Sequence, residues 1–340
     1  MNRIVLYISS GLIIILITAL LYFNFMLNDK PYQKELIINI EKGESTSQII
    51  KKFNEYGYLE PDILFYFYIG FLKLKDNVFI QAGIYKFLPN MNNYEIINSL
   101  INGKNLYTIK VTLPEGLRLN EYAKIIQDKI GINQLDFINL CKSKKIIDKF
   151  NIPADNLEGY LFPSTYFFPA NISTENLIVK LLNEHLKIWN QDFDNQSKSL
   201  GMNKHQILTL ASIIEAETPV DEEKSIVSGL YHNRIRKNML LQADPTVQYA
   251  LNTRELLKTS DLKYNSIYNT YIYKGLPPTP INNPSLSSII AALYPIEHNY
   301  YYMVAIGDGS GRHYFSQTYS EHLINVKKYK KNLVIYNSNR

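Results

Sequence analysis

The chain opens with an uninterrupted apolar segment. Residues 4–27 contain no Asp, Glu, Lys or Arg, and these 24 residues would form a helix of about 36 Å, against about 30 Å for the hydrocarbon core of a membrane. A cleaved signal peptide has a shorter apolar region, of about 7–15 residues, that ends in small residues. We therefore expect an uncleaved transmembrane helix over residues 1–27. Arg3 precedes it, which favours a cytoplasmic N-terminus and places the remaining chain outside the cytoplasm.

The apolar and polar positions that follow predict three strand–turn–helix units. They cover Leu36–Phe53, Gly83–Leu100 and Tyr107–Ile130, and each has a β-branched or aromatic run, a turn and an amphipathic segment. The first two units predict a small α+β module over residues 31–105, although ordinary α+β packing gives the same pattern. Residues 106–340 are richer in helical periodicity, which predicts a larger α+β domain.

One helix of this larger domain carries two acids in an otherwise apolar sequence. Placed at 100° steps, residues 207–214 cover more than half of the circumference with apolar side chains, and Glu215 falls inside this arc. Burying a carboxylate is costly and favours its protonated form, which is what a general acid needs near neutral pH. Glu215 is therefore a catalytic candidate, with a structural ion pair as the alternative. Glu217, at the end of the helix, fits better as a structural or supporting residue.

Polar and aromatic residues follow this helix. Asp244 precedes Pro245, so it either caps a helix there or faces a ligand. Residues 275–284, the proline-rich stretch, hold four prolines, which is typical of a binding loop or of a rigid surface loop. Tyr, Asn, Thr and Gln suit a sugar ligand, because they offer flat apolar faces and neutral hydrogen-bonding groups. The candidates for binding or support are Glu217, Asn233, Arg234, Gln242, Asp244, Thr246, Tyr268, Asn269, Thr270 and Tyr271.

Composition excludes several classes of protein and of functional site. Of the 340 residues 46% are hydrophobic and the formal net charge is only +5, which excludes a disordered chain. The single cysteine, Cys141, excludes an intramolecular disulfide framework and cysteine zinc sites. Gly307–Gly311 predicts a hairpin turn rather than a phosphate-binding loop, and we favour a structural role for His313. No histidine spacing typical of metal sites and no aromatic-interleaved basic patch occurs, so we expect no metal, no cofactor and no nucleic-acid partner.

In their order along the chain, these segments resemble the YceG-like family of endolytic murein transglycosylases. Each motif alone is weak, but the ordered set is specific and covers nearly the whole chain, including the anchor. The resemblance rests on Gly83–Tyr85, Asn156–Tyr166, Ala211–Thr218, Asn233–Arg234, Leu241–Val247, Tyr268–Tyr271 and Gly275–Pro284. The chain departs from the family pattern at Ala216, where Lys is usual, at Ile267, where Pro is frequent, and at Ser285, where Gly is usual. None of these departures touches Glu215.

The resemblance implies a membrane anchor at residues 1–27, a LysM-like module at 31–105 and a lytic transglycosylase domain at 106–340. It implies a single-pass protein of the inner (plasma) membrane that cleaves peptidoglycan between N-acetylmuramic acid and N-acetylglucosamine and leaves 1,6-anhydro-muramyl ends. Glu215 matches the catalytic glutamate of the family. One carboxylate suffices for such a reaction, because the muramyl C6 hydroxyl is an internal nucleophile. The resemblance also implies work beside penicillin-binding peptidoglycan synthases.

Two other functions stay open at this point. A hydrolytic muramidase would pair Glu215 with a second carboxylate, such as Asp244 or Glu217, and would leave reducing ends. A non-catalytic peptidoglycan-binding anchor would rely on the LysM-like module, and Glu215 would then be structural.

Overall fold

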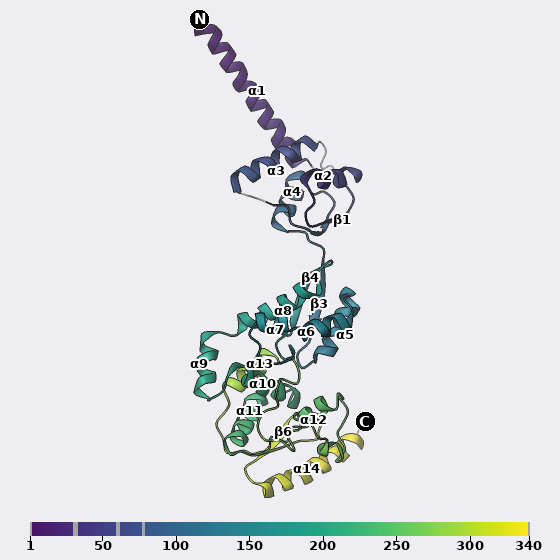
Figure 1. Ribbon diagram of the computed structural model, residues 1–340, viewed down its shortest axis with the longest axis vertical. Coiled ribbons are helices and arrows are strands. Elements are labelled where there is room, and N and C mark those ends of the chain that lie inside the picture. Colours follow the sequence, from purple (N-terminus) through teal and green to yellow (C-terminus); the bar gives the residue numbers. More distant parts are fainter. Residues whose placement is uncertain (1, 30–32, 59–61, 77–78, 339–340) are drawn as a thin grey trace. The chain divides into compact units, whose positions relative to one another are not determined.

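The computed structural model describes residues 2–29, 33–58, 62–76 and 79–338, and the chain divides into two compact units (Figure 1). Unit 1 comprises residues 1–109 and 167–172, and unit 2 comprises residues 110–166 and 173–340. The fold is mixed α+β in both units, as the sequence predicts, with short two-stranded sheets and many helices.

The first helix, α1 (Asn2–Asn28), is apolar along almost its whole length. Within the described residues it is the one helix long and apolar enough to cross a membrane, and only 6% of its most apolar window is buried inside the protein. A core helix of a soluble protein would be largely buried, so the exposure of α1 is compatible with a membrane anchor.

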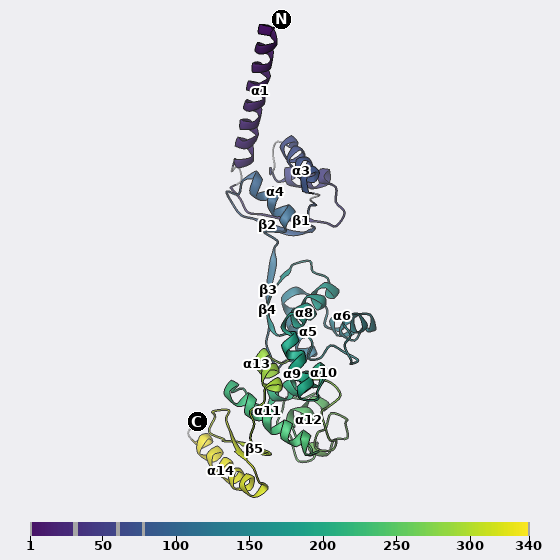
Figure 2. The same ribbon diagram turned by 90° about the vertical axis from the view of Figure 1, so that its left-hand side faces the viewer.

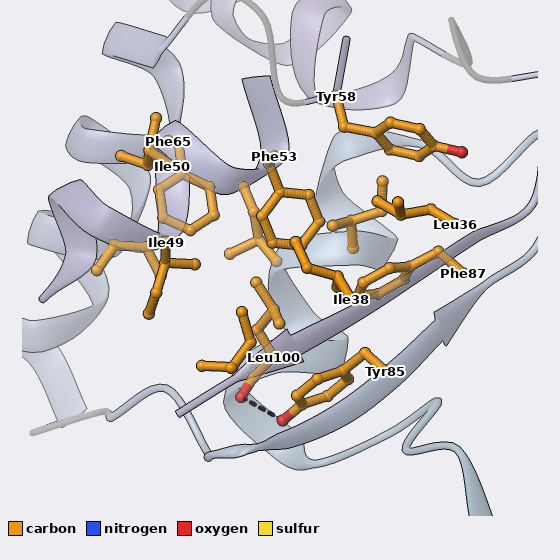
Figure 3. Packing of buried hydrophobic residues seen from close by; sticks show 14 of the residues in the cluster. Leu36, Ile38, Ile49, Ile50, Phe53, Tyr58, Phe65, Tyr85, Phe87 and Leu100 are labelled. Atoms are coloured by element: carbon orange, nitrogen blue, oxygen red, sulfur yellow. Dashed lines mark hydrogen bonds between the residues drawn. The ribbon is translucent and has the colours of Figure 1, made fainter. Parts of the chain in front are cut away.

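The rest of unit 1 is a small antiparallel sheet covered by helices. Strand β1 (Leu36–Ile40) pairs with β2 (Gly83–Phe87), with Ile38 opposite Tyr85. Helices α2 (Thr46–Glu55), α3 (Asp62–Asp76) and α4 (Asn93–Asn102) complete it. Figure 3 shows the core, where the rings of Phe53 and Phe87 lie 5.6 Å apart and the Tyr85 hydroxyl donates to the Leu100 carbonyl.

Unit 2 is mainly helical. Strands β3 (Thr108–Leu113) and β4 (Ser164–Pro169) form a two-stranded sheet, and the chain passes between the units within these strands. Its helices are α5 (Leu119–Ile130), α6 (Gln134–Cys141), α7 (Lys144–Lys149), α8 (Thr174–Ile188), α9 (Gln191–Ser199), α10 (Lys204–Glu217), α11 (Asp221–Arg236), α12 (Asp244–Ala250), the short η1 (Asp261–Lys263), α13 (Leu286–Leu293) and α14 (Tyr319–Ser338).

Helix α10 lies at the centre of unit 2, where it packs against α11, α12 and α13 (Figure 2). Beyond α13, strands β5 (Tyr302–Ala305) and β6 (His313–Ser316) form an antiparallel hairpin against which α14 packs. The predicted hairpin turn at Gly307–Gly311 is thereby confirmed. The three predicted strand–turn–helix units are also confirmed, as β1–α2, β2–α4 and β3–α5. Helix α3 was not predicted, because its central residues, 63–72, include no charged side chain and give no polar face that would mark a helical period.

Candidate active site

Helix α10 positions Glu215 on a rigid backbone. Asn203 caps the helix: its side chain accepts from the backbone N–H of Gln206, and the Gln206 side chain accepts from the backbone N–H of Asn203, both at 2.9 Å. Every residue from 207 to 214 is buried, so neighbouring elements enclose this part of the helix on all sides. This enclosure fixes the direction in which Glu215 leaves the helix.

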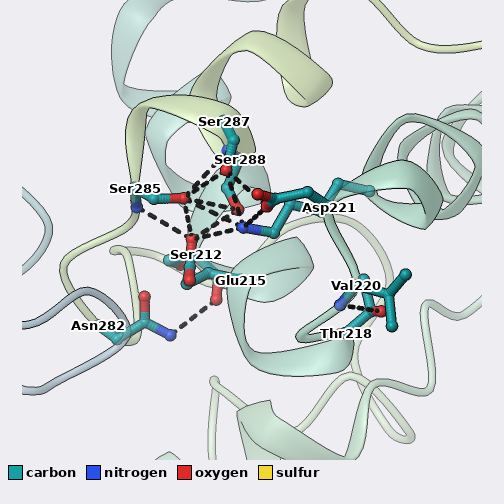
Figure 4. Close-up of polar contacts among 10 residues, drawn as sticks. Ser212, Glu215, Thr218, Val220, Asp221, Asn282, Ser285, Ser287 and Ser288 are labelled. Atoms are coloured by element: carbon teal, nitrogen blue, oxygen red, sulfur yellow. Dashed lines mark hydrogen bonds and ion pairs between the residues drawn. The ribbon is translucent and has the colours of Figure 1, made fainter. Parts of the chain in front are cut away.

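Glu215 uses one of its two carboxylate oxygens for internal hydrogen bonds (Figure 4). Its Oε2 accepts from the Ser285 backbone N–H at 3.0 Å, from the Ser285 hydroxyl, and from the Ser288 hydroxyl at 2.6 Å. Among the residues that the structure describes, none donates to Oε1. The side chain is 8% exposed. One oxygen is therefore anchored, while the other is left for a proton and a substrate atom.

A buried lysine completes this cluster. Lys224 Nζ, on α11, lies 3.5 Å from Glu215 Oε2 and 2.8 Å from Asp221 Oδ1. It donates to the hydroxyls of Ser285 and Ser287 at 3.2 and 2.9 Å. Because the lysine side chain is only 6% exposed, water screens its charge little. Lys224 therefore adds an ionic contact to the serine hydrogen bonds and holds the Glu215 carboxylate in one place.

The proline-rich stretch brings Ser285 to Glu215. Asn282 Nδ2 donates to the Ser212 carbonyl at 2.8 Å, and the Ile281 N–H donates to the Ser212 hydroxyl at 3.0 Å. Both contacts lie on α10, about one turn before Glu215. The stretch contains neither helix nor strand, as predicted, and Ser285 directly after it is the N-cap residue of α13. The expectation that no departure from the family pattern touches Glu215 is therefore wrong for Ser285, because the fold of this stretch brings its N–H and hydroxyl onto the carboxylate.

A turn at residues 114–116 lies on another side of Glu215. Gly116 there has a φ of +72°, a conformation that favours glycine, and its N–H donates to the Asn283 carbonyl at 2.8 Å. A Cβ at this position would lie 3.6 Å from Glu215 Cγ, so the backbone of the turn passes close to the carboxylate. Sequence reasoning predicted this turn but not its place at the site.

Glu217 faces a separate polar cavity of about 320 Å³. Its Oε1 accepts from the Tyr231 hydroxyl at 2.6 Å. Burial raises the pKa of Glu217 from its ordinary value of 4.5 to about 7, and the nearby charge of Asp244 acts in the same direction. Arg234, Gln242, Asp244 and Tyr271 also line this cavity, whereas Glu215 is not among its described lining residues.

Known proteins match this chain over most of its length. The model of the YceG-like family matches residues 38–328. The chain belongs to this family. It is 32% identical over 328 residues to the endolytic murein transglycosylase of Bacillus subtilis. This match covers 92% of this chain and 90% of that protein. It is 25% identical to the endolytic murein transglycosylase of Streptococcus pneumoniae R6, over 88% of this chain and 59% of that protein.

A solved structure is similar as well. The crystal structure of a YceG-like protein from Listeria monocytogenes matches with a TM-score of 0.58 and 30% sequence identity, and the match covers 86% of this chain and 99% of that one. The family resemblance inferred from the motifs is thus confirmed.

In this YceG-like chain, four predicted residues line the cavity beside Glu217: Arg234, Gln242, Asp244 and Tyr271. Asp244 begins α12 without capping it, because Ala243 is the N-cap residue. The Asp244 carboxylate instead accepts from the Tyr271 hydroxyl at 2.6 Å. This arrangement leaves several polar groups around one space, and their contact with a glycan stays a prediction.

The other predicted residues hold neighbouring segments together. Asn233 donates to the carbonyls of His298 and Tyr300 at 2.8 and 3.0 Å. The Thr246 and Thr270 hydroxyls lie 2.9 Å apart and are buried. Asn269 Nδ2 donates to the carbonyls of Leu262 and Tyr264, and the Tyr268 hydroxyl lies 2.8 Å from that of Thr279. These side chains position the loops, and their contact with a glycan stays a prediction.

Sequence reasoning missed Lys224, Ser287 and Ser288. A signal for Lys224 was present, because it lies on the same face of α11 as Val227 and Tyr231, which are buried. A lysine on a buried face needs a carboxylate partner. The serines of the α13 N-terminus carry no such signal, because serine is common at the start of any helix.

Glu158 is a further deeply buried carboxyl of unit 2. It is 4% exposed, and its Oε1 accepts from the Leu119 N–H at 3.0 Å. Burial raises the pKa of Glu158 from 4.5 to about 8, although the Leu119 bond and the charge of Arg118 oppose the shift. Glu158 also contacts Asn283 Nδ2 at 3.5 Å, so it supports the chain that leads to Ser285.

Among the residues that the structure describes, no group of three or more His, Cys, Asp or Glu side chains is placed to hold a metal ion. His313 is engaged elsewhere, since its Nδ1 lies 2.9 Å from Glu223 Oε2.

Proposed function

We propose that this chain is a membrane-anchored endolytic lytic transglycosylase of peptidoglycan, with Glu215 as its acid and base. The observation that carries the proposal is the asymmetry of the Glu215 carboxylate: Oε2 is held by serines and Lys224, whereas Oε1 has no hydrogen-bond partner among the residues that the structure describes. Relatives named endolytic murein transglycosylases, which act on murein by their names, support the substrate class.

In the first step, Glu215 donates the proton on Oε1 to the oxygen between N-acetylmuramic acid and N-acetylglucosamine. The bond from that oxygen to the muramyl C1 breaks, and positive charge develops at C1. The proton is expected on Oε1 because the donors around Glu215 occupy Oε2. The ionised Glu215 that results is stabilised by the charge of Lys224 at 3.5 Å.

In the second step, the ionised Glu215 takes the proton of the muramyl C6 hydroxyl, whose oxygen forms a bond to C1. The product is a 1,6-anhydro-muramyl end, and Glu215 recovers its proton. No water is consumed, because the nucleophile belongs to the substrate and is already close to C1. A single carboxylate thus serves both steps, and Glu217 and Asp244 are not required as a second one.

The proposal includes the place of the protein in the cell. Helix α1 anchors the chain once in the inner (plasma) membrane, with a cytoplasmic N-terminus and with the chain from about Asn28 onward outside the cytoplasm. Residues 31–105 form a LysM-like module, which is supported by the pairing of β1 with β2 and by the two helices between them. Residues 106–340 form the lytic domain.

An enzyme anchored in this way meets glycan strands as they are made. We therefore propose penicillin-binding peptidoglycan synthases as its partners and termination of nascent strands as its role. Chemical crosslinking of intact membranes followed by purification of this chain tests the partner. Recovery of a synthase supports it, and recovery of none under conditions that crosslink a known membrane complex contradicts it.

The reaction is tested with the full chain in detergent and purified uncrosslinked glycan strands. Mass spectrometry of the strand ends compares the wild type with Glu215→Gln and with Glu222→Gln, a control at an exposed acid whose side chain is 75% accessible. Anhydro-muramyl ends from the wild type and the control, and none from Glu215→Gln, are expected. Reducing ends would identify a hydrolase instead. No cleavage by folded wild-type protein would favour a binding anchor.

A further inference from the structure

Helix α3 presents an aromatic face outward. Phe67 and Phe71 are 66% and 61% exposed and Tyr66 is 43% exposed, whereas Phe65 and Ile69 on the opposite side are buried in the unit 1 core. No residue from 65 to 72 is charged. A helix on the surface of a soluble domain carries polar side chains on its outer side, so this face needs a partner.

The same helix is tied to the end of α1. The rings of Phe23 on α1 and Tyr68 on α3 lie 6.4 Å apart, and Tyr68 in turn lies 6.1 Å from Tyr94 on α4. Asn93 on α4 donates to the Met26 carbonyl at 3.0 Å. These contacts fix α3 and α4 against the last turns of α1.

Within unit 1, α1 departs on the side occupied by α3, and β1 and β2 lie on the opposite side (Figures 1 and 2). The end of α1 itself exposes aromatic side chains, since Tyr22 and Phe25 are 65% and 67% exposed. Aromatic residues gather at the membrane–water interface, where their rings lie at the level of the lipid headgroups.

We propose that the outer face of α3, formed by Tyr66, Phe67 and Phe71, is a second membrane-binding surface that lies in the headgroup layer of the outer leaflet. The inference rests on the proposed function in one respect, which is that α1 spans the membrane. If it does, the last turns of α1 lie at the outer interface, and α3, which contacts them, lies at the same depth. The lipid surface is then the partner that covers the aromatic face.

Such a surface would give unit 1 two attachments to the bilayer. A single transmembrane helix leaves the domain that follows it free to change its orientation on the membrane. A second contact some distance from the first restrains that orientation. Interfacial helices bury their apolar face about 5–10 Å into the boundary between headgroups and acyl chains. Phe67 and Phe71 are therefore expected at shallow depth in the outer leaflet, much nearer the membrane surface than the middle of α1.

The test uses the full chain in nanodiscs of phosphatidylcholine and phosphatidylglycerol. Cys141, which is buried, is replaced by Ala, and an environment-sensitive fluorophore is attached at Phe67→Cys or Phe71→Cys. Control labels are placed at Ile14→Cys in α1 and at Ile37→Cys on the exposed side of β1; these native side chains are 62% and 50% exposed. Quenching is measured with nitroxide lipids of shallow and deep label position, and with aqueous iodide.

The proposal expects labels at positions 67 and 71 to be quenched several-fold more strongly by shallow nitroxide than the label at position 37, and to be protected from iodide. The label at position 14 should respond to deep nitroxide. If position 14 responds but 67 and 71 behave like 37, α1 spans the membrane and the proposal is overturned. Protection from iodide without lipid quenching would identify a protein partner, such as a second copy, and would also overturn it. If position 14 does not respond, the anchor and the proposal both fail.

Discussion

Replacing Glu158 by Gln should make unit 2 more stable at neutral and alkaline pH. Burial raises the pKa of Glu158 to about 8, whereas an unfolded chain releases this proton near its ordinary value of 4.5. Below about pH 4.5 both states are protonated, and the stability of the native state is fully present. As the pH rises from there toward 8, only the unfolded state ionises, so the native state loses stability. Gln cannot ionise and avoids this loss.

The magnitude follows from linkage. Each pH unit between the two pKa values costs about 1.4 kcal/mol, so about 3 kcal/mol of unfolding free energy is lost between pH 5 and pH 7.5. The difference between Glu158→Gln and the wild type should therefore grow by about that amount over this range, in favour of the variant. The Gln side chain keeps an oxygen that can accept from the Leu119 N–H, so little difference is expected at pH 5.

Urea unfolding of the detergent-solubilised chain, followed by tryptophan fluorescence, measures this difference. The single tryptophan, Trp189, lies in unit 2 and donates to Asp194 at 2.6 Å, so its emission reports the unfolding of this unit. Glu255→Gln, at an exposed acid, is the matched control and should show a constant offset. A Glu158→Gln difference that does not change with pH would refute the reasoning.

Substitutions at three further positions, each compared with the wild type or a control variant, test the site and its support. Ser285→Gly removes a hydroxyl bond to Glu215 but keeps the backbone donor, so glycan cleavage should fall only about five-fold; a loss as complete as that of Glu215→Gln would contradict it. Lys224→Met removes the buried cation beside Glu215 and should reduce the rate of glycan cleavage about tenfold or more. Circular dichroism should show that the variant is folded like the wild type. Lys224→Arg should restore part of this rate. Gly159→Ala should destabilise by about 2–4 kcal/mol in the urea assay, because its φ is +82° and the new Cβ would lie 2.3 Å from Pro280 Cβ. Gly201→Ala, with φ +69° and open space, should cost only about 1 kcal/mol.

Local pattern alone predicts much of the chain. The apolar run of α1, the strand–turn–helix units and the hairpin at residues 302–316 follow from periodicity and turn residues. The same holds for Glu215, because its place in the apolar arc of α10 depends only on helix geometry and on burial of the side chains around it. These features are set by residues close to one another in sequence.

The surroundings of Glu215 are decided by tertiary structure. Lys224 comes from the next helix, and Ser285 and Ser288 lie 70 and 73 residues further along the chain. Their meeting depends on how the proline-rich stretch packs against α10, which no local period encodes. Many residues of that region also proved to hold loops together, as Asn269 does with its two carbonyl partners.

The outward face of helix α3 is also decided by tertiary structure and not by local sequence. Its composition is apolar all round, so periodicity cannot say which side is the core and which is the surface. Only the packing of Phe65 and Ile69 into unit 1 leaves Phe67 and Phe71 outside, and only the contact with α1 places them beside the end of that helix. The sequence by itself determines most of the helices, the apolar length of α1 and the buried acid, since these depend on neighbours in the chain. The partners of that acid and the outward face of α3 depend on distant segments brought together by burial of apolar surface, and the tertiary structure alone decides them.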